Sequence, residues 1–418
     1  MERKLFPAVL ILVTVFYQLQ PAEAQNRFIE GVDPTLTYTV DLLSNIRGGR
    51  DTGVRFMDNL DLELRIDMKK SLGIDGGVLY LYGLANQGGD LSADLVGDFQ
   101  VASNIEADES WRFYEIWYHQ MIRGLRSSIL VGLYDLNSEF DVNDTGQLFL
   151  NSSHGIGAAF GNSGVLGPSI FPLTSFGGRL KWNIWEGLVL KTAVLDGIPS
   201  NPANTSGTKI LFRENDGLLL ATELSFIADG KQKSMGTGRH GRMRRFLSRD
   251  ETSEYRFKVA VGGWLYTEDR EGWIDADGLL HRDRGIYLLG DVSLYRESVE
   301  SPQGLSGFFR FGLANEAINR LGGYAGGGLV YTGLFRKRSN DKLGIAVAYA
   351  VNSSRYRDSL EAAGEASEKA ETGIEATYLF ALGDHLNLQW DMQYVINPNM
   401  EPSLDNALIL GLRTGIAF

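Results

Sequence analysis

Two sets of side chains in this chain have the chemistry to bind a solute with many hydroxyl groups. The first set alternates along one short segment and accepts hydrogen bonds: Asp135, Asn137, Glu139, Asp141 and Asn143. The second set consists of cations from three other segments, which can donate to hydroxyl oxygens: Arg179, Lys181, Arg256, Lys258 and Arg310. Opposed charges across a channel would cancel each other's long-range field, which favours neutral polar solutes over ions. The sequence predicts that these residues line a pore, although each of them could instead brace a neighbour or fasten a loop.

The cations lie on segments in which polar and apolar residues alternate. In residues 59–68 the odd positions are polar or charged, whereas the even positions are Leu, Ile or Met. The same alternation recurs in residues 176–185, 255–265, 305–313 and 385–396. A period of two indicates β-strands with one polar and one apolar face. In a membrane barrel the polar face lines the lumen and the apolar face contacts lipid.

Counting such segments predicts an all-β protein, a transmembrane antiparallel up-and-down β-barrel of about sixteen strands. Their expected centres are near residues 40, 62, 81, 116, 130, 180, 192, 222, 260, 290, 309, 329, 348, 376, 390 and 412. An even number of strands keeps both termini in the periplasm. External loops are then expected at 87–109, 136–175, 197–216, 268–284, 356–369 and 398–405, and periplasmic turns at 186–187, 336–342 and 382–384.

One connection on the predicted periplasmic side is long and strongly basic, at residues 229–253. It is either a docking arm for acidic groups or a flexible, solvated run of charge.

Both ends of the chain indicate export to the bacterial outer membrane. Residues 1–24 combine two early cations, an apolar stretch and a small-residue cleavage site, which together predict a cleaved signal peptide. Residues 25–418 are then the barrel domain. The last strand ends on the aromatic residue Phe418 and is apolar on one face only, which is typical of the final strand of such barrels.

The composition excludes several classes of protein and site. The 418 residues contain no cysteine, which rules out disulfides and thiolate metal sites, and their 50 glycines and 11% aromatics suit a β-rich protein. The net charge of −12 argues against nucleic acid as a partner, because phosphate binding needs clustered cations.

No motif predicts an enzyme, a cofactor or a metal site. The five histidines are scattered without zinc-ligand spacing. Ser153 and His154 are adjacent, so on a strand they would point in opposite directions, and no nucleophile-elbow motif is present. Residues 141–146 loosely resemble a calcium loop, but the position of the bidentate glutamate holds Ser152. A cation that braces this loop stays an alternative.

The connection at residues 136–175 is longer than a hairpin needs. It mixes Asn, Ser, Gly and Asp with the aromatic residues Phe140, Phe149, Phe160 and Phe171. Aromatic anchors need a surface to pack against, and in a wide barrel the nearest such surface is the lumen. This segment is therefore expected to fold inward and narrow the pore.

Several stretches resemble the carbohydrate-selective porin family of the OprB type. They are VGDFQVASNIEA at 96–107, WRFYEIWYHQ at 111–120, GLYDLNSEF at 132–140, FLNSSHG at 149–155, GPSIFPLTSFGGRLKW at 167–182, ETGIEATYLF at 371–380, YVINPN at 394–399 and ALILGLRTGIAF at 407–418. The resemblance covers the mature chain in family order. It implies a sixteen-stranded outer-membrane barrel that passes sugars by diffusion, with inward-folded loops forming the constriction. The basic segment at 229–253 is longer than that family leads one to expect.

The sequence thus predicts a non-enzymatic outer-membrane porin for small neutral sugars, embedded in outer-membrane lipid. It leaves open whether the barrel is a monomer or a homo-oligomer. A less selective or anion-preferring general porin is the first alternative, because the predicted lumen cations could cluster at the constriction. A structural or adhesive barrel with a plugged lumen is the alternative of another class, and a soluble carbohydrate-binding protein is a third.

Overall fold

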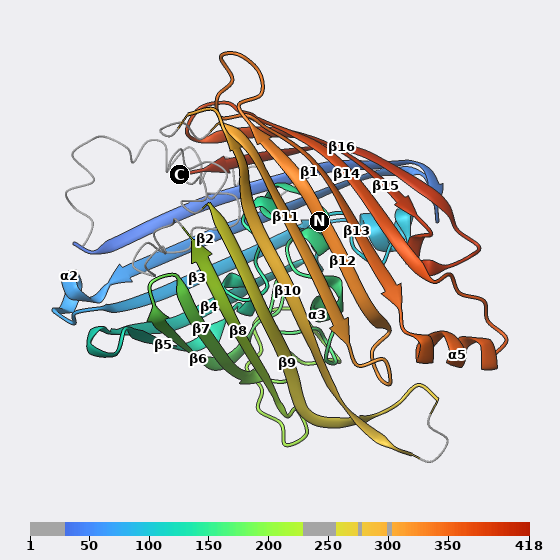
Figure 1. Cartoon of the computed structure of the whole chain (residues 1–418), viewed down its shortest axis with the longest axis horizontal. Coiled ribbons are helices and arrows are strands. Elements are labelled where there is room, and N and C mark those ends of the chain that lie inside the picture. The colour runs from blue at the N-terminus through green and yellow to red at the C-terminus, as the bar shows by residue number, and fades with distance from the viewer. Residues whose placement is uncertain (1–29, 229–255, 275–277, 299–302) are drawn as a thin grey trace.

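In the computed structural model the chain forms one closed antiparallel barrel of sixteen strands, each paired with its neighbours in sequence and β1 paired with β16 (Figure 1). The structure describes residues 30–228, 256–274, 278–298 and 303–418. The strands are β1 (Val32–Gly49), β2 (Gly53–Asp67), β3 (Gly77–Gly88), β4 (Ser110–Ile122), β5 (Ser127–Tyr134), β6 (Ser175–Trp185), β7 (Leu188–Asp196), β8 (Leu218–Ala228), β9 (Phe257–Glu271), β10 (Leu280–Arg296), β11 (Gly304–Ala314), β12 (Leu321–Thr332), β13 (Lys342–Asn352), β14 (Ala370–Ala381), β15 (Leu386–Ile396) and β16 (Asp405–Ala417).

Every predicted strand centre falls inside one of these strands, so the predicted fold class and the strand count are confirmed. The expected connection at 268–284 was wrong in its bounds, because β9 continues to Glu271 and β10 already begins at Leu280. The predicted signal peptide, the start of the mature chain and the basic segment at 229–253 lie outside the described residues.

The alternating side chains point as the period-two pattern requires. On β2 the polar residues Asn59, Asp61 and Glu63 are buried inside the barrel, whereas Leu62 between them is 54% exposed on its outer surface. The inner face of β15 is likewise polar and buried, and its outer face carries the exposed Trp390. The outer surface is therefore apolar and suited to lipid, and the polar side chains face inward. No helix among the described residues is long and apolar enough to span a membrane.

The barrel closes between its first and last strands. Phe418 and Leu36 exchange backbone hydrogen bonds of 2.9 and 3.2 Å. Farther along this seam, Arg413 on β16 lies opposite Asp41 on β1, and two of its nitrogens bind the two carboxylate oxygens at 2.6 and 2.7 Å. A bidentate pair of this kind fixes geometry as well as adding energy. Closure therefore leaves no unpaired strand edge at the seam, as a lipid environment demands.

The connections differ strongly between the two ends of the barrel. We call the end at which β1 begins and β16 finishes the terminal end, and the opposite one the loop end. At the terminal end the described connections are short, such as the turn at 186–187 and the segment with helix α2 (Met68–Leu72), which Asp67 caps and Gly73 ends with a φ of 75°. The loop end carries the connections at 89–109, 135–174 and 197–217, and α5 (Ser354–Ala362).

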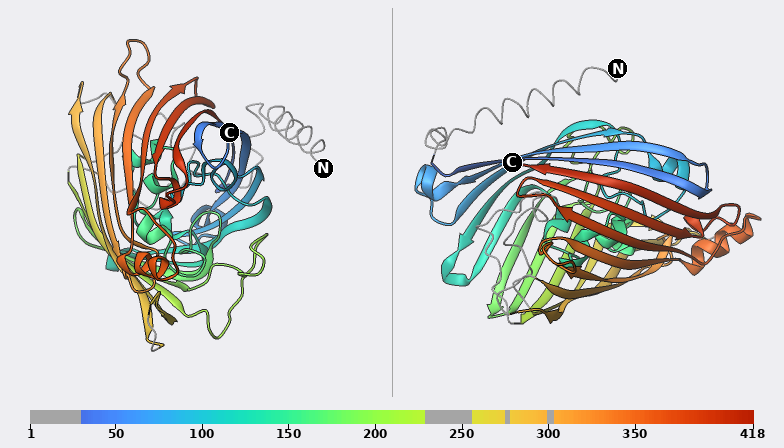
Figure 2. Two further views of the ribbon diagram at one scale, coloured as in Figure 1. Left: turned by 90° about the vertical axis from the view of Figure 1, so that its right-hand side faces the viewer. Right: turned by 90° about the horizontal axis from the view of Figure 1, so that it is seen from above.

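The connection at 135–174, hereafter the long loop, lies inside the ring of strands (Figure 2). It contains only short helical turns, namely η4 (Leu136–Ser138), η5 (Thr145–Leu148), η6 (Ser152–His154) and α3 (Ala158–Gly161). Many of its apolar side chains, among them Phe140 and Phe160, belong to one buried cluster with inward-facing residues such as Tyr80 on β3 and Tyr324 on β12. Leu150 and Phe149 belong to two smaller clusters. The core of this protein is therefore a loop packed against the barrel wall.

Candidate functional site

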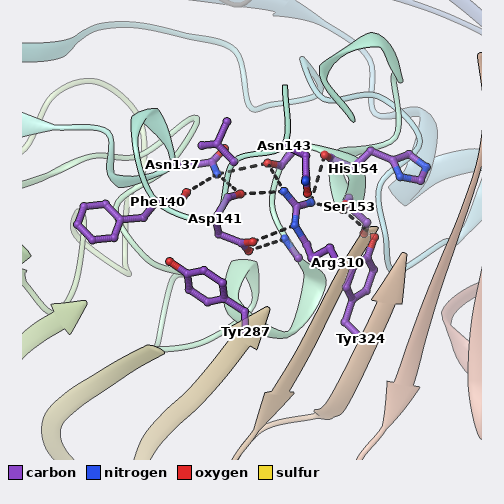
Figure 3. Close-up of polar contacts among 12 residues, drawn as sticks. Asn137, Phe140, Asp141, Asn143, Ser153, His154, Tyr287, Arg310 and Tyr324 are labelled. Atoms are coloured by element: carbon purple, nitrogen blue, oxygen red, sulfur yellow. Dashed lines mark hydrogen bonds and ion pairs between the residues drawn. The ribbon is translucent and has the colours of Figure 1, made fainter. Parts of the chain in front are cut away.

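An ion pair joins the long loop to β11 (Figure 3). Nε of Arg310 lies 2.8 Å from Oδ1 of Asp141, and both side chains are almost completely buried. The other two guanidinium nitrogens donate to the backbone oxygens of Ser153, His154, Asp141 and Gly155, at 2.8 to 3.2 Å. One arginine thus binds two separate turns of the loop. A buried charge needs such complete pairing, because burial without it costs several kcal/mol.

Asp141 also organises the loop around itself. Its second carboxylate oxygen accepts the backbone N–H of Gly157 at 2.9 Å, and its own backbone N–H donates to Glu223 on β8. The residue has a φ of 52°, a left-handed conformation that aspartate tolerates better than most residues. Asn137 donates from its amide to the backbone oxygens of Asp141 and Phe140. These contacts hold the start of the loop in one conformation.

A second ion pair fastens the loop to β6. Nε of Arg179 lies 2.6 Å from a carboxylate oxygen of Glu139, and Tyr134 donates its hydroxyl to the same carboxylate at 2.8 Å. Burial by itself raises the pKa of Glu139, but the positive charges of Arg179, Lys181 and Lys191 outweigh it and lower that pKa to about 2. Glu139 therefore stays ionised and paired at any pH near neutrality.

Carboxylates on the wall bind backbone N–H groups of the loop. Asp291 on β10 accepts from Asp144 and Thr145, and Glu375 on β14 accepts from Leu150 and Asn151. A loop without regular secondary structure leaves such N–H groups unpaired, and each would be costly inside a water-poor lumen. The wall carboxylates therefore replace the hydrogen bonds that a helix or sheet would have supplied.

Aromatic stacking holds the tip of the long loop against the barrel wall. The ring of Phe160, in α3, stacks on Trp264 of β9 with centroids 4.5 Å apart and an interplanar angle of 14°. It also stacks against Tyr287 of β10 at 5.9 Å. Next to this contact Asp283 accepts the backbone N–H of Gly164 at 2.6 Å. The tip is thus held by β9 and β10, which lie four and five strands along the barrel wall from β5, where the loop begins.

A second segment from the loop end, residues 89–109, covers the seam of the barrel. We call it the seam loop. Ser103 donates to Asp41 at 2.7 Å, beside the Asp41–Arg413 pair, and Gln393 on β15 donates to the backbone oxygen of Ala102 at 2.8 Å. Glu371 on β14 accepts the backbone N–H groups of this loop at residues 99 and 100. Both loops therefore bind inward-facing side chains of the barrel wall.

The structure is a closed barrel with loops folded inside it, and comparisons with known proteins show which family of barrels it belongs to. A family model described as carbohydrate-selective porin, OprB family, matches residues 51–418. The chain belongs to this family. It is an outer-membrane porin for the diffusion of sugars, and the family is one of channels rather than enzymes.

Individual relatives share this fold over almost their whole length. Porin B of Pseudomonas aeruginosa is 24% identical over 420 residues, which cover 93% of this chain and 88% of that protein. The high-pH structure of Pseudomonas putida OprB matches with a TM-score of 0.78 and 20% identity, over 95% of this chain and 96% of that one. The low-pH structure of the same protein matches with a TM-score of 0.56 and 16% identity, over 95% of each chain.

An anion-selective porin from Comamonas acidovorans matches with a TM-score of 0.53 and 10% identity, over 93% of this chain and 99% of that chain. At such identities these structures show the common barrel fold.

In this OprB-family porin most of the side chains predicted to line the pore take part in holding the long loop. Arg179, Glu139, Asp141 and Arg310 form the two ion pairs described above. Asn143 donates to Asp291 and to the backbone of β10, and Lys258 donates to the backbone oxygen of Val142 at 2.6 Å. We therefore propose that these residues shape the opening of the pore by holding the long loop in position.

The remaining predicted residues lie elsewhere. Asp135 is buried at the start of the loop, where its backbone N–H donates to Glu115 on β4. Arg256 is exposed at the terminal end, directly before β9. Lys181 faces the lumen from β6, two residues closer to the terminal end than Arg179.

The wall carboxylates were absent from the predicted site. Each of these carboxylates occupies an inward position of a strand in which polar and apolar residues alternate: Glu223, Asp291 and Glu375. This alternation is the sequence signal that could have identified them. Their neighbours in sequence do not show that they accept hydrogen bonds from the backbone N–H groups of a loop more than eighty residues away. Among the described residues, no group of three or more histidines, aspartates and glutamates is arranged to hold a metal ion, and residues 141–146 owe their conformation to Arg310 and Asp291.

Proposed function

We propose that small neutral carbohydrates diffuse passively, and without enzymatic chemistry, through the opening that the long loop and the seam loop leave in the lumen. The observation that carries this proposal is the pairing of opposite charges on the wall and at its contact with the long loop. Arg310 pairs with Asp141, Arg179 with Glu139, and Lys191 with Glu223 at 2.5 Å. Paired charges have a weak long-range field, so they neither attract nor repel ions strongly.

The same pairs leave groups that suit hydroxyl-bearing solutes. Carboxylate and backbone oxygens accept from hydroxyl groups, and guanidinium and ammonium groups donate to them. Sites of this kind give binding that is weak enough for release, as a diffusion channel requires. We further propose that the loop end faces outward, that the termini lie in the periplasm, and that the outer apolar face contacts outer-membrane lipid. A homo-oligomer would cover part of that face, and the mass of the barrel in detergent would reveal it.

Deletion of residues 143–164, closed by a short glycine linker, tests the role of the long loop. This change removes the Phe160 stacking and three of the four backbone oxygens that Arg310 binds. The lumen should therefore widen, and single-channel conductance should rise severalfold. The purified barrel in a planar bilayer supplies the measurement, and a shift in electrophoretic mobility on heating shows that each variant is folded. Unchanged conductance would show that this loop is not the constriction.

The uninterrupted apolar cluster that joins the loop to β3 and β12 supports a second candidate, a structural barrel with a plugged lumen. The two candidates differ in liposome swelling. The porin predicts swelling of vesicles containing the protein in an isosmotic glucose solution, at a rate that falls for larger sugars. A plugged barrel predicts no swelling in any sugar.

A further inference from the structure

A row of four side chains at the loop end joins a connection at the rim of the barrel to the buried core. Trp273, in the connection after β9, contacts Tyr356 of α5 with ring centroids 4.8 Å apart. The guanidinium group of Arg320, in the turn between β11 and β12, lies 5.3 Å from the centre of the Tyr356 ring and 4.5 Å from that of Phe99. Phe99 belongs to the seam loop and packs on the cluster that the long loop forms with the wall. Each member of the row therefore touches the next one.

Hydrogen bonds hold the inner part of this row in place. Nη2 of Arg320 donates to the backbone and side-chain oxygens of Asn399, at 2.7 and 2.8 Å. One carboxylate oxygen of Glu371 accepts the backbone N–H groups of both Phe99 and Asn399, at 2.7 and 2.6 Å. The turn before β12 is joined to α5, because the backbone N–H of Ser353 donates to the backbone oxygen of Arg320 at 2.7 Å. The row is therefore held in one arrangement without any solute.

The outer part of the row offers an exposed ring and polar atoms that a solute can reach. Trp273 is 39% exposed, and its backbone N–H donates to the backbone oxygen of Ala317 at 2.9 Å. It therefore lies in the connections beyond the strand ends, where contact with lipid hydrocarbon does not account for its exposure. The hydroxyl group of Tyr356 and Nη1 of Arg320 make no hydrogen bond among the described residues, and neither atom is shut off from solvent.

We propose that Trp273, Tyr356 and Arg320 form a capture subsite for the pyranose ring of a neutral sugar that enters from the loop end. The C–H face of the pyranose packs on the exposed face of the Trp273 ring. The hydroxyl groups of the sugar bind Nη1 of Arg320, which donates, and the hydroxyl group of Tyr356, which both donates and accepts. This inference rests on the proposed sugar channel and adds to it a binding step at the mouth of the lumen.

The combination of groups distinguishes a sugar from other solutes and from a structural role alone. An inorganic anion could bind Arg320 but would gain nothing from the ring of Trp273, and a purely apolar solute would leave the polar atoms unused. A sugar uses both, because it has an apolar face and a rim of hydroxyl groups. A clamp that only holds the seam loop needs the contacts of Arg320 with Phe99 and Asn399. Such a clamp does not need the exposed face of Trp273.

The first test measures the block of single-channel current by maltose, added to each side of the bilayer in turn, in the full-length porin and in Trp273→Leu. Leucine keeps an apolar contact with Tyr356 but removes the flat ring. The rate at which maltose enters from the loop end should fall about fivefold, the change expected when one aromatic contact is lost. Entry from the terminal end should be unchanged. The matched control is Trp111→Leu, because Trp111 is 60% exposed on the outer face of β4.

A second variant, Trp273→Phe, keeps an aromatic ring at this position. It should retain most of the entry rate of maltose, whereas a role in packing alone would make leucine and phenylalanine equivalent. Intrinsic tryptophan fluorescence of the porin in detergent gives an independent measure of binding. Maltose should change the emission of the unaltered porin, and this change should disappear in Trp273→Phe. Conductance without sugar should be the same in both variants and in the unaltered porin.

Each other outcome contradicts a separate claim. Equal maltose entry in Trp273→Leu and the unaltered porin would overturn the subsite and leave the sugar channel standing. An equal fall in the entry of a polyethylene glycol of similar size would show apolar contact without sugar recognition. Altered conductance of Trp273→Leu without sugar would assign Trp273 to the support of α5 instead. A fluorescence change that depends on Trp273, in a barrel whose current no sugar blocks and through which no sugar passes, would overturn the proposed channel and leave the subsite standing.

Discussion

The two loops inside the barrel differ in how their own buried carboxyl groups are paired. The long loop contributes carboxylates that pair with cations of the wall, as Asp141 does with Arg310. The seam loop contributes buried carboxyl groups that have no such partner close by. Burial raises the pKa of Asp98 to about 6, and burial together with the charge of Asp98 raises the pKa of Glu106 to about 8. The positive charge that acts on Asp98 is that of Arg50.

This difference gives the two loops opposite responses to pH. The pKa of Glu139 in the long loop is lowered to about 2, so its ion pair is fully formed above pH 4.5 and is lost only as the pH falls toward 2. The pKa of Glu106 in the seam loop is higher in the docked loop than its ordinary value of 4.5. Docking of the seam loop is therefore strongest below pH 4.5 and weakens as the pH rises through about 8. We therefore expect the long loop to stay docked over the physiological pH range and the seam loop to loosen within it.

The substitution Arg310→Gln should have the largest effect, because it leaves the Asp141 carboxylate buried without its partner. Removal of one partner of a buried ion pair costs roughly 3–5 kcal/mol. We expect the long loop to detach from the barrel wall, which should raise single-channel conductance and increase its noise. The control is Arg282→Gln, which removes an arginine from the exposed pair with Asp269. A quiet channel of unaltered conductance would show that the loop keeps its position without Arg310.

The substitution Glu106→Gln should remove a pH dependence rather than the constriction itself. A pKa shift of one unit corresponds to about 1.4 kcal/mol. Because Glu106 is partly exposed, its ionisation should weaken docking of the seam loop by on the order of 1–3 kcal/mol at pH 8. Conductance of the unaltered porin should therefore rise between pH 4.5 and 8.

In Glu106→Gln that rise should be much smaller, because the amide cannot ionise. Glu139→Gln serves as the comparison within the other loop, and it should leave the rise between pH 4.5 and 8 in place. An identical pH profile for Glu106→Gln and the unaltered porin would exclude Glu106 as the titrating group.

The substitution Ser103→Ala should have the smallest effect. It removes the hydrogen bond that the seam loop donates to Asp41, while the Asp41–Arg413 pair remains. A hydrogen bond to a charged group is worth about 1.5 kcal/mol. We expect a slightly higher conductance at every pH and an unchanged barrel, with Ser403→Ala on an exposed turn as the control. A change in heat-modifiable mobility would instead show that Ser103 supports closure of the barrel.

Much of the barrel could be predicted because its strands depend on a local pattern. In residues 59–68 and 385–396 every second side chain is apolar, and this period alone decides which face meets lipid. The site was harder to predict. Asp141 and Arg310 were both expected at the pore, but their direct contact joins residues far apart in sequence. Glu375 and Asp291 were missed because their hydrogen bonds go to loop backbone, whose positions no side-chain pattern records.

The sequence by itself determined that this chain is a sixteen-stranded outer-membrane barrel closed at Phe418, because strand period, turn chemistry and the two faces of each strand are short-range properties. The tertiary structure alone decided which charges cancel and which remain. Whether a cation on the wall is neutralised depends on where a loop lies in the lumen, and that position follows from packing and hydrogen bonds between distant segments. Among the described residues Arg310 forms a direct ion pair, with Asp141, whereas the charge of Lys181 acts on Glu139 without one.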